Sequence, residues 1–484
     1  MTHIFSASKL GLLVLFSCLL CLHQAAASES RPPNILFILA DDLGKEWVST
    51  YGAEDIQTPN IDSLAETGMK FDNFYSTPQC TPSRVTLMTG QYPFRHGWVN
   101  HWDVPRWGGG AHFDSNANPS IARVMQSAGY RTAAAGKWQI NDFRVQPEAM
   151  VSHGFDDYCM WTGFEAGNPP SANRYWDPYI HTKEGSKTYK GQFGEDIFSD
   201  FLIEFMREHK DEPMFLYYAM CLPHTPFVST PADPNATGTY DRHKAMVRYM
   251  DYIIGKLVHA LDELGLRDNT IVIYTTDNGT TPKVTGRING REVQGGKMRL
   301  LESGVCEPII VNCPGLVPEG EVTYALADLS DILPTCAELG GATLPGQYVF
   351  DGVSFAPLIL GQTEESPRDW IMAMGGNGNR SAAALSEAGV ENQYVFRDRV
   401  VRNEEYKLYI STDRQPEKLV SVINDPDERV NLLESDDPEI RAQFESLWLA
   451  AQAFPAQDND PDYVPLPPEP WDKEVTVQSQ SWKQ

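Results

Sequence analysis

Positive charge is in short supply in this chain. Its 39 lysines and arginines are outnumbered by 65 aspartates and glutamates, and the formal net charge is −26. The acidic residues are spread along the sequence rather than gathered in one tail. Such a surface repels nucleic acid, so a nucleic-acid partner is excluded, and it repels polyanions in general. An anionic substrate would therefore require an active site that is locally basic.

Long hydrophobic runs are absent after the N-terminal segment, so no later stretch approaches the roughly 20 apolar residues that span a membrane. The early run, Leu10–Leu22, is too short for the same purpose. Lys9 precedes it and three alanines at 25–27 follow it, a pattern typical of a secretory signal peptide over the first 27 residues. A lipid anchor through Cys18 or Cys21 is the alternative. We expect a secreted or periplasmic protein without a membrane span.

The cysteines are too few and too irregularly spaced for a disulfide framework. Two of the eight leave with the signal peptide, and Cys80 belongs to a motif described below. An odd number without regular spacing supports no disulfide scaffold. The remaining five are Cys159, Cys221, Cys306, Cys313 and Cys336.

Continuous apolar runs alternate with helix-like segments through the first three quarters of the chain. Such runs are typical of strands buried on both faces, and the alternation predicts an α/β fold. We expect a large, mostly parallel mixed sheet sandwiched by helices, with ligands at the carboxyl ends of its strands. The expected strands are 34–40, 214–220 and 270–276, and the expected helices are 61–67, 121–128, 197–209 and 245–264.

The pattern changes after residue 361. Short segments of alternating polarity predict antiparallel strands, and an amphipathic helix follows them. At 484 residues the chain is long enough for a large domain and a smaller partner. We expect a catalytic domain over 28–361 and a C-terminal α+β subdomain with an antiparallel sheet over 362–484. Its expected elements are strands 393–401, 406–410 and 419–423, helix 438–454 and an irregular tail from Pro455.

The most informative stretch is Cys80-Thr81-Pro82-Ser83-Arg84, which precedes an apolar, helix-compatible run. A helix N-terminus exposes unsatisfied N–H groups and positive potential, so it favours an anionic nucleophile or a bound oxyanion. A cysteine before a helix is by itself more often a small buried hydrophobe. The complete pentapeptide indicates chemistry on a charged ester.

The pattern Cys-x-Pro-Ser-Arg resembles the signature of the type I sulfatases of the alkaline-phosphatase-like superfamily, and the match continues through residues 90–97. In that family the cysteine is oxidised to Cα-formylglycine, whose hydrated aldehyde is the nucleophile. The resemblance implies that Cys80 is not a thiol in the active protein and that a formylglycine-generating enzyme acts during maturation. Residues 424–432 resemble the family's C-terminal motif.

Two pairs of oxygen-bearing side chains follow predicted strands: Asp41 with Asp42, and Asp277 with Asn278. One such pair alone is usually a solvated turn. Two pairs at strand ends suit a hard cation such as Ca²⁺ or Mg²⁺ better than zinc. The resemblance implies one divalent ion, usually Ca²⁺, held by these four residues and in contact with Cys80. Such an ion polarises the sulfate and acidifies the nucleophilic hydroxyl.

Sulfuryl transfer needs cations around the equatorial oxygens and a proton for the leaving oxygen. The resemblance implies that Lys137 and Lys297 bind the sulfate and that Arg84 holds the hydrated aldehyde. It makes His224, in Pro-His-Thr-Pro-Phe, the acid for the departing alkoxide. Each of these residues alone is more often a solvated charge or a loop histidine. Their joint occurrence in order favours the catalytic interpretation.

One position departs from the family pattern. Sulfatases usually have Gly-Lys-Trp-His, and this chain has Gln139 in place of that histidine. In the family the histidine contacts the formylglycine and helps to expel sulfate by removing a proton. An amide can orient a hydroxyl but cannot take its proton near neutral pH. We therefore expect Gln139 to be a positioning residue, with His96 or His101 as the substitute base.

Two aromatic-rich loops, residues 98–107 and 158–189, contain Trp, Tyr, Arg and His side chains. Exposed aromatic rings suit the apolar faces of sugars, although the same rings could pack the loops against the body. We favour a sulfated polysaccharide or oligosaccharide as substrate. The alternatives are an aryl sulfatase, a phosphodiester or phosphonate ester hydrolase of the same superfamily, and a catalytically silent protein that binds sulfated glycans.

Overall fold

The computed structural model describes residues 31–98, 113–165, 167–375 and 396–459, with residues 385–386, 389–390 and isolated positions between 462 and 470. Residues from Pro33 onward form one compact unit, and the description below concerns that unit. The predicted signal peptide lies outside the described residues. No helix in the described part of the chain is long and apolar enough to cross a membrane.

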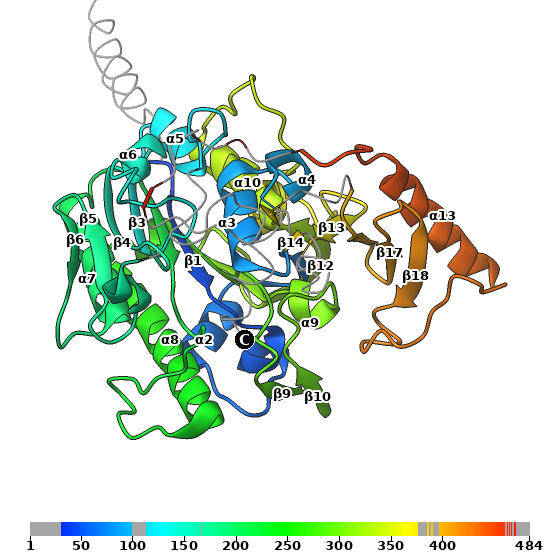
Figure 1. Ribbon diagram of the computed structural model, residues 1–484, viewed down its shortest axis with the longest axis horizontal. Coiled ribbons are helices and arrows are strands. Elements are labelled where there is room, and N and C mark those ends of the chain that lie inside the picture. Colours follow the sequence, from blue (N-terminus) through cyan, green and yellow to red (C-terminus); the bar gives the residue numbers. More distant parts are fainter. Residues whose placement is uncertain are drawn as a thin grey trace, which may run out of the picture. The chain divides into compact units, whose positions relative to one another are not determined.

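A ten-stranded mixed sheet lies at the centre of this unit (Figure 1). Its strands are β1 (Asn34–Ala40), β2 (Met69–Tyr75), β3 (Arg131–Lys137), β4 (Asp157–Trp161), β5 (Tyr179–Thr182), β6 (Gly185–Thr188), β7 (Met214–Ala219), β8 (Thr270–Thr276), β11 (Ile309–Asn312) and β12 (Glu321–Asp328). Their order is β12-β2-β11-β8-β1-β7-β3-β4-β5-β6. The central run from β8 to β4 is parallel, and β12 is parallel to β2. Only β11, β5 and β6 pair in the antiparallel sense.

Helices cover both faces of the sheet because its central strands are apolar on both sides. In β1, Ile35, Phe37 and Leu39 pack into one core with α3, α5 and α10, and the residues between them pack into a second core with α2, α7 and α8. This alternation follows from the two-residue period of a strand. The longer helices are α2 (Pro59–Glu66), α3 (Cys80–Thr89), α5 (Ile121–Ser127), α7 (Gly194–Glu208), α8 (Gly238–Glu263) and α10 (Ile332–Gly340).

Short elements connect the layers. The β9–β10 hairpin lies between β8 and the segment that carries Lys297. The short strands are β9 (Thr285–Ile288) and β10 (Arg291–Gln294), with β14 (Leu385–Ser386) and β15 (Gly389–Val390) in a second pair. The short helices are η1 (Lys45–Trp47), η2 (Ser49–Tyr51), α4 (Pro93–His96), α6 (Ala149–Ser152), η3 (Pro169–Ala172), η4 (Arg267–Asn269), α9 (Glu302–Val305), η5 (Leu329–Asp331) and α11 (Ala356–Ile359).

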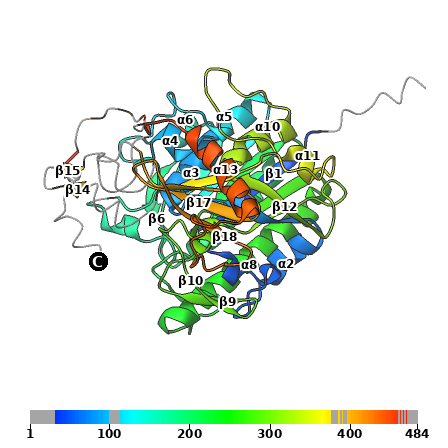
Figure 2. The ribbon, with the colours of Figure 1, turned by 90° about the vertical axis from the view of Figure 1, so that its right-hand side faces the viewer.

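A four-stranded antiparallel sheet follows in the C-terminal part of the chain. Its strands are β13 (Ile371–Met374), β16 (Arg399–Arg402), β17 (Tyr406–Ile410) and β18 (Pro416–Ser421), in that order. Helix α13 (Pro438–Gln452) packs against β16 and β17 through Leu408 and Leu447 (Figure 2). The opposite face contacts the main sheet through Val400 and Leu326. Both sheets agree with the predicted fold class, a mostly parallel mixed sheet between helices and a smaller antiparallel sheet.

Candidate active site

The carboxyl ends of β1 and β8 bring the two acidic pairs together. The strands are parallel neighbours with Ala40 opposite Thr276, and the backbone N–H of Asp277 donates to the Ala40 carbonyl at 3.0 Å. The two acidic pairs therefore lie side by side just after Ala40 and Thr276, at the edge of the sheet where ligands of α/β proteins bind. All four members, Asp41, Asp42, Asp277 and Asn278, are buried.

Several potential ligand atoms of this group and of Cys80 lie close enough together to share one cation. One ligand atom each of Asp41, Cys80 and Asp277 lie within 4.8 Å of one another. Asp41 Oδ1 and Asn278 Oδ1 are buried and accept no hydrogen bond from the described residues. The Asn278 amide is oriented by its Nδ2, which donates to Asp42 Oδ1 at 2.9 Å. Since Ca²⁺ takes about six to eight oxygen ligands, these residues fit one such ion.

The buried carboxyl groups of Asp41 and Asp277 need nearby positive charge in order to ionise. Burial raises the pKa of the Asp277 carboxyl well above its usual value, and the neighbouring Asp41 raises it further. Burial acts on the Asp41 carboxyl in the same direction, yet Lys137 and other cations hold the pKa of Asp41 well below its usual range. Two buried carboxylates this close ionise together only with help from cations. A divalent ion would supply that help.

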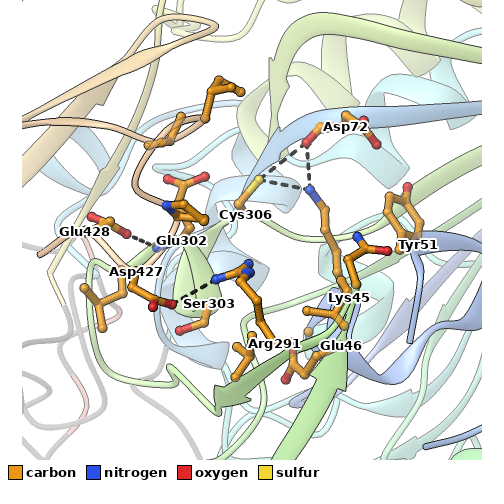
Figure 3. Close-up of a pocket in the computed structure, with 18 of the residues that line it drawn as sticks. Lys45, Glu46, Tyr51, Asp72, Arg291, Glu302, Ser303, Cys306, Asp427 and Glu428 are labelled. Atoms are coloured by element: carbon orange, nitrogen blue, oxygen red, sulfur yellow. Dashed lines mark hydrogen bonds and ion pairs between the residues drawn. The ribbon is translucent and has the colours of Figure 1, made fainter. Parts of the chain in front are cut away.

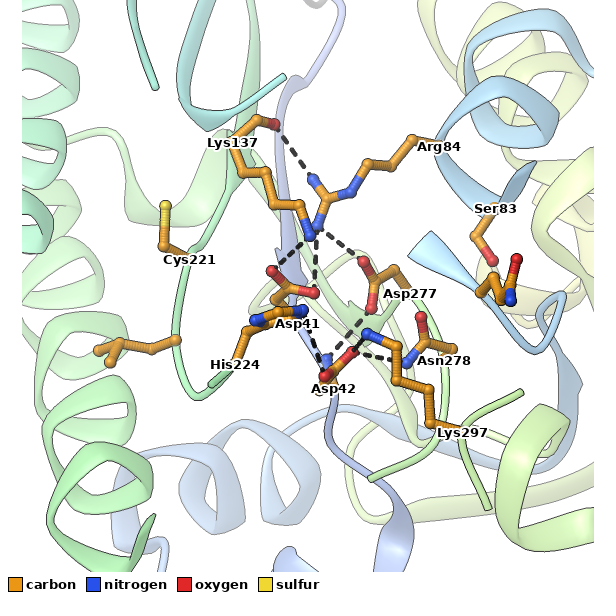
Figure 4. A network of polar contacts seen from close by, with 12 residues as sticks. Asp41, Asp42, Ser83, Arg84, Lys137, Cys221, His224, Asp277, Asn278 and Lys297 are labelled. Carbon is orange, nitrogen blue, oxygen red and sulfur yellow. Dashed lines mark hydrogen bonds and ion pairs between the residues drawn. The ribbon is translucent and has the colours of Figure 1, made fainter. Parts of the chain in front are cut away.

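Two lysines from different elements reach the carboxylates of the first acidic pair, one lysine to each (Figure 4). Lys137 is the last residue of β3, and its Nζ donates to Asp41 Oδ2 at 2.7 Å. Lys297 lies in the loop after β10, and its Nζ donates to Asp42 Oδ1. Burial opposes the charge on Lys297, but Asp42 and the other nearby acidic groups together outweigh it and raise the pKa of this lysine. Both ammonium groups therefore lie beside the carboxylates that follow β1.

The start of α3 places Cys80 and Arg84 on one face, because residues four apart on a helix are neighbours. The entry to the helix is fixed by Thr77 and Ser83: the two hydroxyls lie 2.7 Å apart, and the Thr77 N–H donates to Ser83 Oγ at 3.2 Å. Arg84 Nη2 donates to Asp277 Oδ2 at 2.7 Å. The serine of the motif thus shapes the loop, and the arginine faces the acidic centre.

His224 follows β7 and lies at the edge of the acidic group. Its Nε2 is 3.5 Å from Asp42 Oδ2, and its Nδ1 is 2.7 Å from Arg174 Nη2. Burial lowers the pKa of His224 well below its usual value, and Lys297 lowers it further. In the absence of a bound anion the imidazole is therefore neutral. A bound anion beside the ring would act in the opposite direction.

Arg174 is a site residue that sequence reasoning placed elsewhere, among the residues of an aromatic loop. The structure buries it behind His224, with its guanidinium 4.6 Å from the centre of the Trp161 ring. It also contacts the Thr225 carbonyl. Arg174 and His224 lie fifty residues apart in the chain, and no local sequence motif links them. Only the three-dimensional structure reveals that Arg174 orients the histidine.

The aromatic side chains of the two loops divide into packing and exposed groups. Trp98, Trp161 and Tyr175 are buried, so these three rings are not exposed to a sugar. They join the two main cores, which is the packing alternative considered for these loops. Phe164 and Trp176 are 40% and 39% exposed and remain available to a ligand. Residues 99–112, which include His101, lie outside the described residues.

Gln139 follows the Lys137 strand in a left-handed conformation, with φ of 71°. Its backbone N–H donates to the Thr162 carbonyl at 3.0 Å, and Gly163 lies against its side chain. These contacts hold residue 139 between the end of β3 and the loop after β4. The backbone hydrogen bond therefore helps to fix the position of Gln139 beside the end of β3.

His96 does not meet the requirements for the substitute base. Its Nδ1 accepts a hydrogen bond from the Trp98 N–H at 3.0 Å, and its Nε2 is 3.0 Å from Thr86 Oγ1. The ring nitrogen with the free lone pair is thus already occupied, and burial lowers the pKa of His96 to about 3. Thr86 lies six residues beyond Cys80 on α3, about 9 Å along the helix axis. The expectation for His96 is corrected, and His101 remains untested.

Known proteins are similar to this chain in sequence and in fold. The sulfatase family model matches residues 33–342. Bovine (Bos taurus) arylsulfatase A is 31% identical over 489 residues, covering 90% of this chain and 93% of the relative. Human (Homo sapiens) N-acetylgalactosamine-6-sulfatase is 31% identical over 364 residues, covering 70% and 67%. The solved structure of Ps i-CgsB in complex with k-i-k-neocarrahexaose is 24% identical, with a TM-score of 0.73 and coverage of 94% and 97%.

Proposed function

The chain belongs to the sulfatase family and is a sulfuric ester hydrolase, and we propose that its substrate is a sulfated carbohydrate, either a polysaccharide or an oligosaccharide. Two comparisons support this class: a relative named as a sulfatase of N-acetylgalactosamine, and a structure of the same fold with a bound neocarrahexaose. The exposed rings of Phe164 and Trp176 add apolar surface that suits sugars.

The observation that carries the proposed chemistry is the convergence of charged side chains beside Cys80. Four cationic residues of the site face three aspartates, so the side chains alone carry one excess positive charge. One divalent ion among them would raise the excess to three, so the site would attract an anionic sulfate ester. The site is then locally basic within a chain of net charge −26, which is the condition that an anionic substrate imposes.

The residues of the chain have separate tasks in this proposal. Asp41, Asp42, Asp277, Asn278 and residue 80 hold Ca²⁺. With the carboxylate oxygens turned to the ion, the two lysine ammonium groups are available to the equatorial oxygens of sulfate. Arg84 orients residue 80, and Arg174 orients His224 toward the leaving oxygen.

Two groups must be added to the chain before it can act. When bound, Ca²⁺ supplies a Lewis acid for the sulfate, and the hydrated aldehyde at residue 80 supplies the hydroxyl nucleophile. The aldehyde requires a formylglycine-generating enzyme as a maturation partner. The secretory pattern in residues 1–27 supports export, so we propose a secreted or periplasmic enzyme.

Sulfated oligosaccharides are expected to be hydrolysed with a higher kcat/KM than 4-nitrophenyl sulfate, and 4-nitrophenyl phosphate with a far lower one. A sulfate monoester carries one negative charge and a phosphate monoester carries two near neutral pH, so moving the phosphate into this buried site costs more desolvation. A screen of defined sulfated oligosaccharides, read by ion chromatography of released sulfate, measures the first comparison. Faster hydrolysis of phosphate or phosphonate esters would assign the enzyme to the rival class.

The missing histidine leads to an expectation about the release of sulfate. If His101 is the substitute base, His101→Ala should keep a rapid first release of alcohol and slow the steady state about a hundredfold, the usual range of general base catalysis. His96→Ala is the matched control and should turn over normally, since its ring is engaged by Thr86 and Trp98. Stopped-flow detection of 4-nitrophenol distinguishes the two phases. Normal turnover of both variants would show that neither histidine is the base, and that Gln139 or a water molecule is sufficient for the release of sulfate.

A further inference from the structure

A cavity of about 510 Å³ lies between the β9–β10 hairpin and the C-terminal sheet (Figure 3). Its wall is formed by the segment after β1, the middle of β2, the hairpin, residues 299–306 and residues 422–429. None of the candidate catalytic or metal-binding residues lines it. Its volume is in the range of ligand pockets, about 300–1,000 Å³. The cavity is therefore a separate site large enough for a small ligand.

Two chain segments lead from the active site into this cavity. Gly44 comes two residues after Asp42, and Arg299 comes two residues after Lys297. Asp42 and Lys297 contact each other in the active site. Since two residues extend at most about 7 Å, the wall of the cavity begins within that distance on both segments. The active site and the cavity wall therefore share two short chain segments, so the cavity lies next to the active site.

The cavity wall is close to neutral. Five basic and six acidic side chains line it. Burial raises the pKa of one of the acids, Glu46, to about 7, although a hydrogen bond with Thr280 opposes this. Other charges are paired within the wall: Arg291 with Asp427 at 2.9 Å, and Arg402 with Glu302 at 2.6 Å. Paired donors and acceptors without excess charge suit hydroxyl groups better than a second sulfate.

The wall of the cavity also exposes apolar side chains and a guanidinium that can donate hydrogen bonds. Tyr324, on β12, and Ile423, after β18, are 61% and 62% exposed although both side chains are large and apolar. Arg299 is exposed, and its guanidinium forms no ion pair with the described residues. A flat ring and a guanidinium without an ion pair among the described residues, both on the wall of one cavity, match a sugar, which has an apolar face and hydroxyl groups at its edge.

We propose that this cavity binds an uncharged sugar unit of the substrate chain, next to or one unit beyond the sugar that carries the scissile sulfate. This inference rests on the proposed carbohydrate substrate. It makes the enzyme selective for oligosaccharides or polymers over a sulfated monosaccharide. The selectivity comes from the β12 edge, the Arg299 segment and the C-terminal sheet, rather than from the catalytic centre.

The test compares the hydrolysis of small and of long substrates by variants of the cavity wall. Tyr324→Ala is expected to reduce kcat/KM about five- to tenfold for sulfated tetra- and hexasaccharides, the size of effect expected when one aromatic contact is lost. Hydrolysis of 4-nitrophenyl sulfate should be unchanged, because that substrate does not reach the cavity. Arg299→Gln should act in the same direction. Tyr252→Ala, which removes a 53% exposed tyrosine of α8 outside the cavity, is the matched control and should change neither rate.

The two levels of the proposal fail in different ways. If wild type hydrolyses the oligosaccharides and both cavity variants keep the wild-type ratio of long to small substrate, the cavity is not a sugar site and the proposed function stands. A wild-type preference for the sulfated monosaccharide would overturn the cavity proposal as well. If wild type hydrolyses only 4-nitrophenyl sulfate and no oligosaccharide, the carbohydrate function itself fails, and the cavity proposal fails with it.

Discussion

Cys80→Ala is expected to reduce the hydrolysis of every sulfate ester to the background rate while the protein still folds. Cys80 is the first residue of α3 and is completely buried beside the acidic centre, where the nucleophile must lie. Alanine lacks the thiol whose oxidation converts Cβ to the aldehyde, so the nucleophile is lost. The missing sulfur leaves a void of about one methyl group, which costs about 1 kcal/mol of unfolding free energy. Sulfate release and thermal unfolding measure the two effects.

Cys336→Ala is the matched control, because Cys336 is equally buried but lies in α10 within the apolar core. It should lose a similar amount of stability and keep full turnover. Peptide mass spectrometry of the wild type provides the independent observation. The peptide with residue 80 should lack one sulfur and two hydrogens and carry one additional oxygen. An active enzyme with an intact thiol on every Cys80 would contradict the proposed nucleophile.

Much of the fold could be predicted because its central strands carry a local signal. Residues 34–40 and 270–276 are continuous apolar runs, and the structure has strands with these same bounds. Helix α8 begins at Gly238, seven residues before the predicted start at 245. Its first turns are polar and exposed, so they lack the apolar period on which the prediction depended.

The order of the strands was not predictable from such signals. Strand β11 inserts between β2 and β8 and runs antiparallel to both. Its apolar run of four residues resembles any short buried strand. The choice of its neighbours depends on contacts between segments more than 200 residues apart in the chain, such as Ile309 with Phe71. Local composition contains no information on that choice.

In the candidate site, too, some features could be predicted from local sequence and others depend on contacts between distant segments. Asp41 and Asp277 could be placed together because each follows a strand and parallel strands end at one edge of a sheet. The contact between Arg174 and His224 could not, since Arg174 lies in an irregular loop. The cavity beside the site was equally hidden, because its wall combines the β12 edge with the C-terminal sheet. Sequence patterns thus identify the chemistry more readily than the surroundings that select a substrate.

Asp277→Asn is expected to lower kcat/KM by at least about a hundredfold and to weaken Ca²⁺ binding. The amide keeps an oxygen for the Asp42 N–H, which donates to Asp277 Oδ1 at 3.2 Å, so the turn after β8 is preserved. The substitution removes one negative charge from the metal site and the ion pair with Arg84 at 2.7 Å. Elemental analysis of the purified protein and titration calorimetry with Ca²⁺ measure the loss of the ion independently of activity.

Asp251→Asn tests whether any buried carboxylate would give the same result. Asp251 lies on α8 and accepts hydrogen bonds from the backbone N–H groups of Asn60 and Ile61 at 3.1 and 2.9 Å, remote in sequence from the acidic pairs. This variant should unfold more easily but bind Ca²⁺ and turn over substrate normally. In the wild type, Ca²⁺ at a hundred times its Kd should stabilise the fold by about 2.7 kcal/mol, and Asp277→Asn should lose most of this gain. Full activity of chelator-treated, metal-free wild type would show that these oxygens serve the fold rather than a catalytic ion.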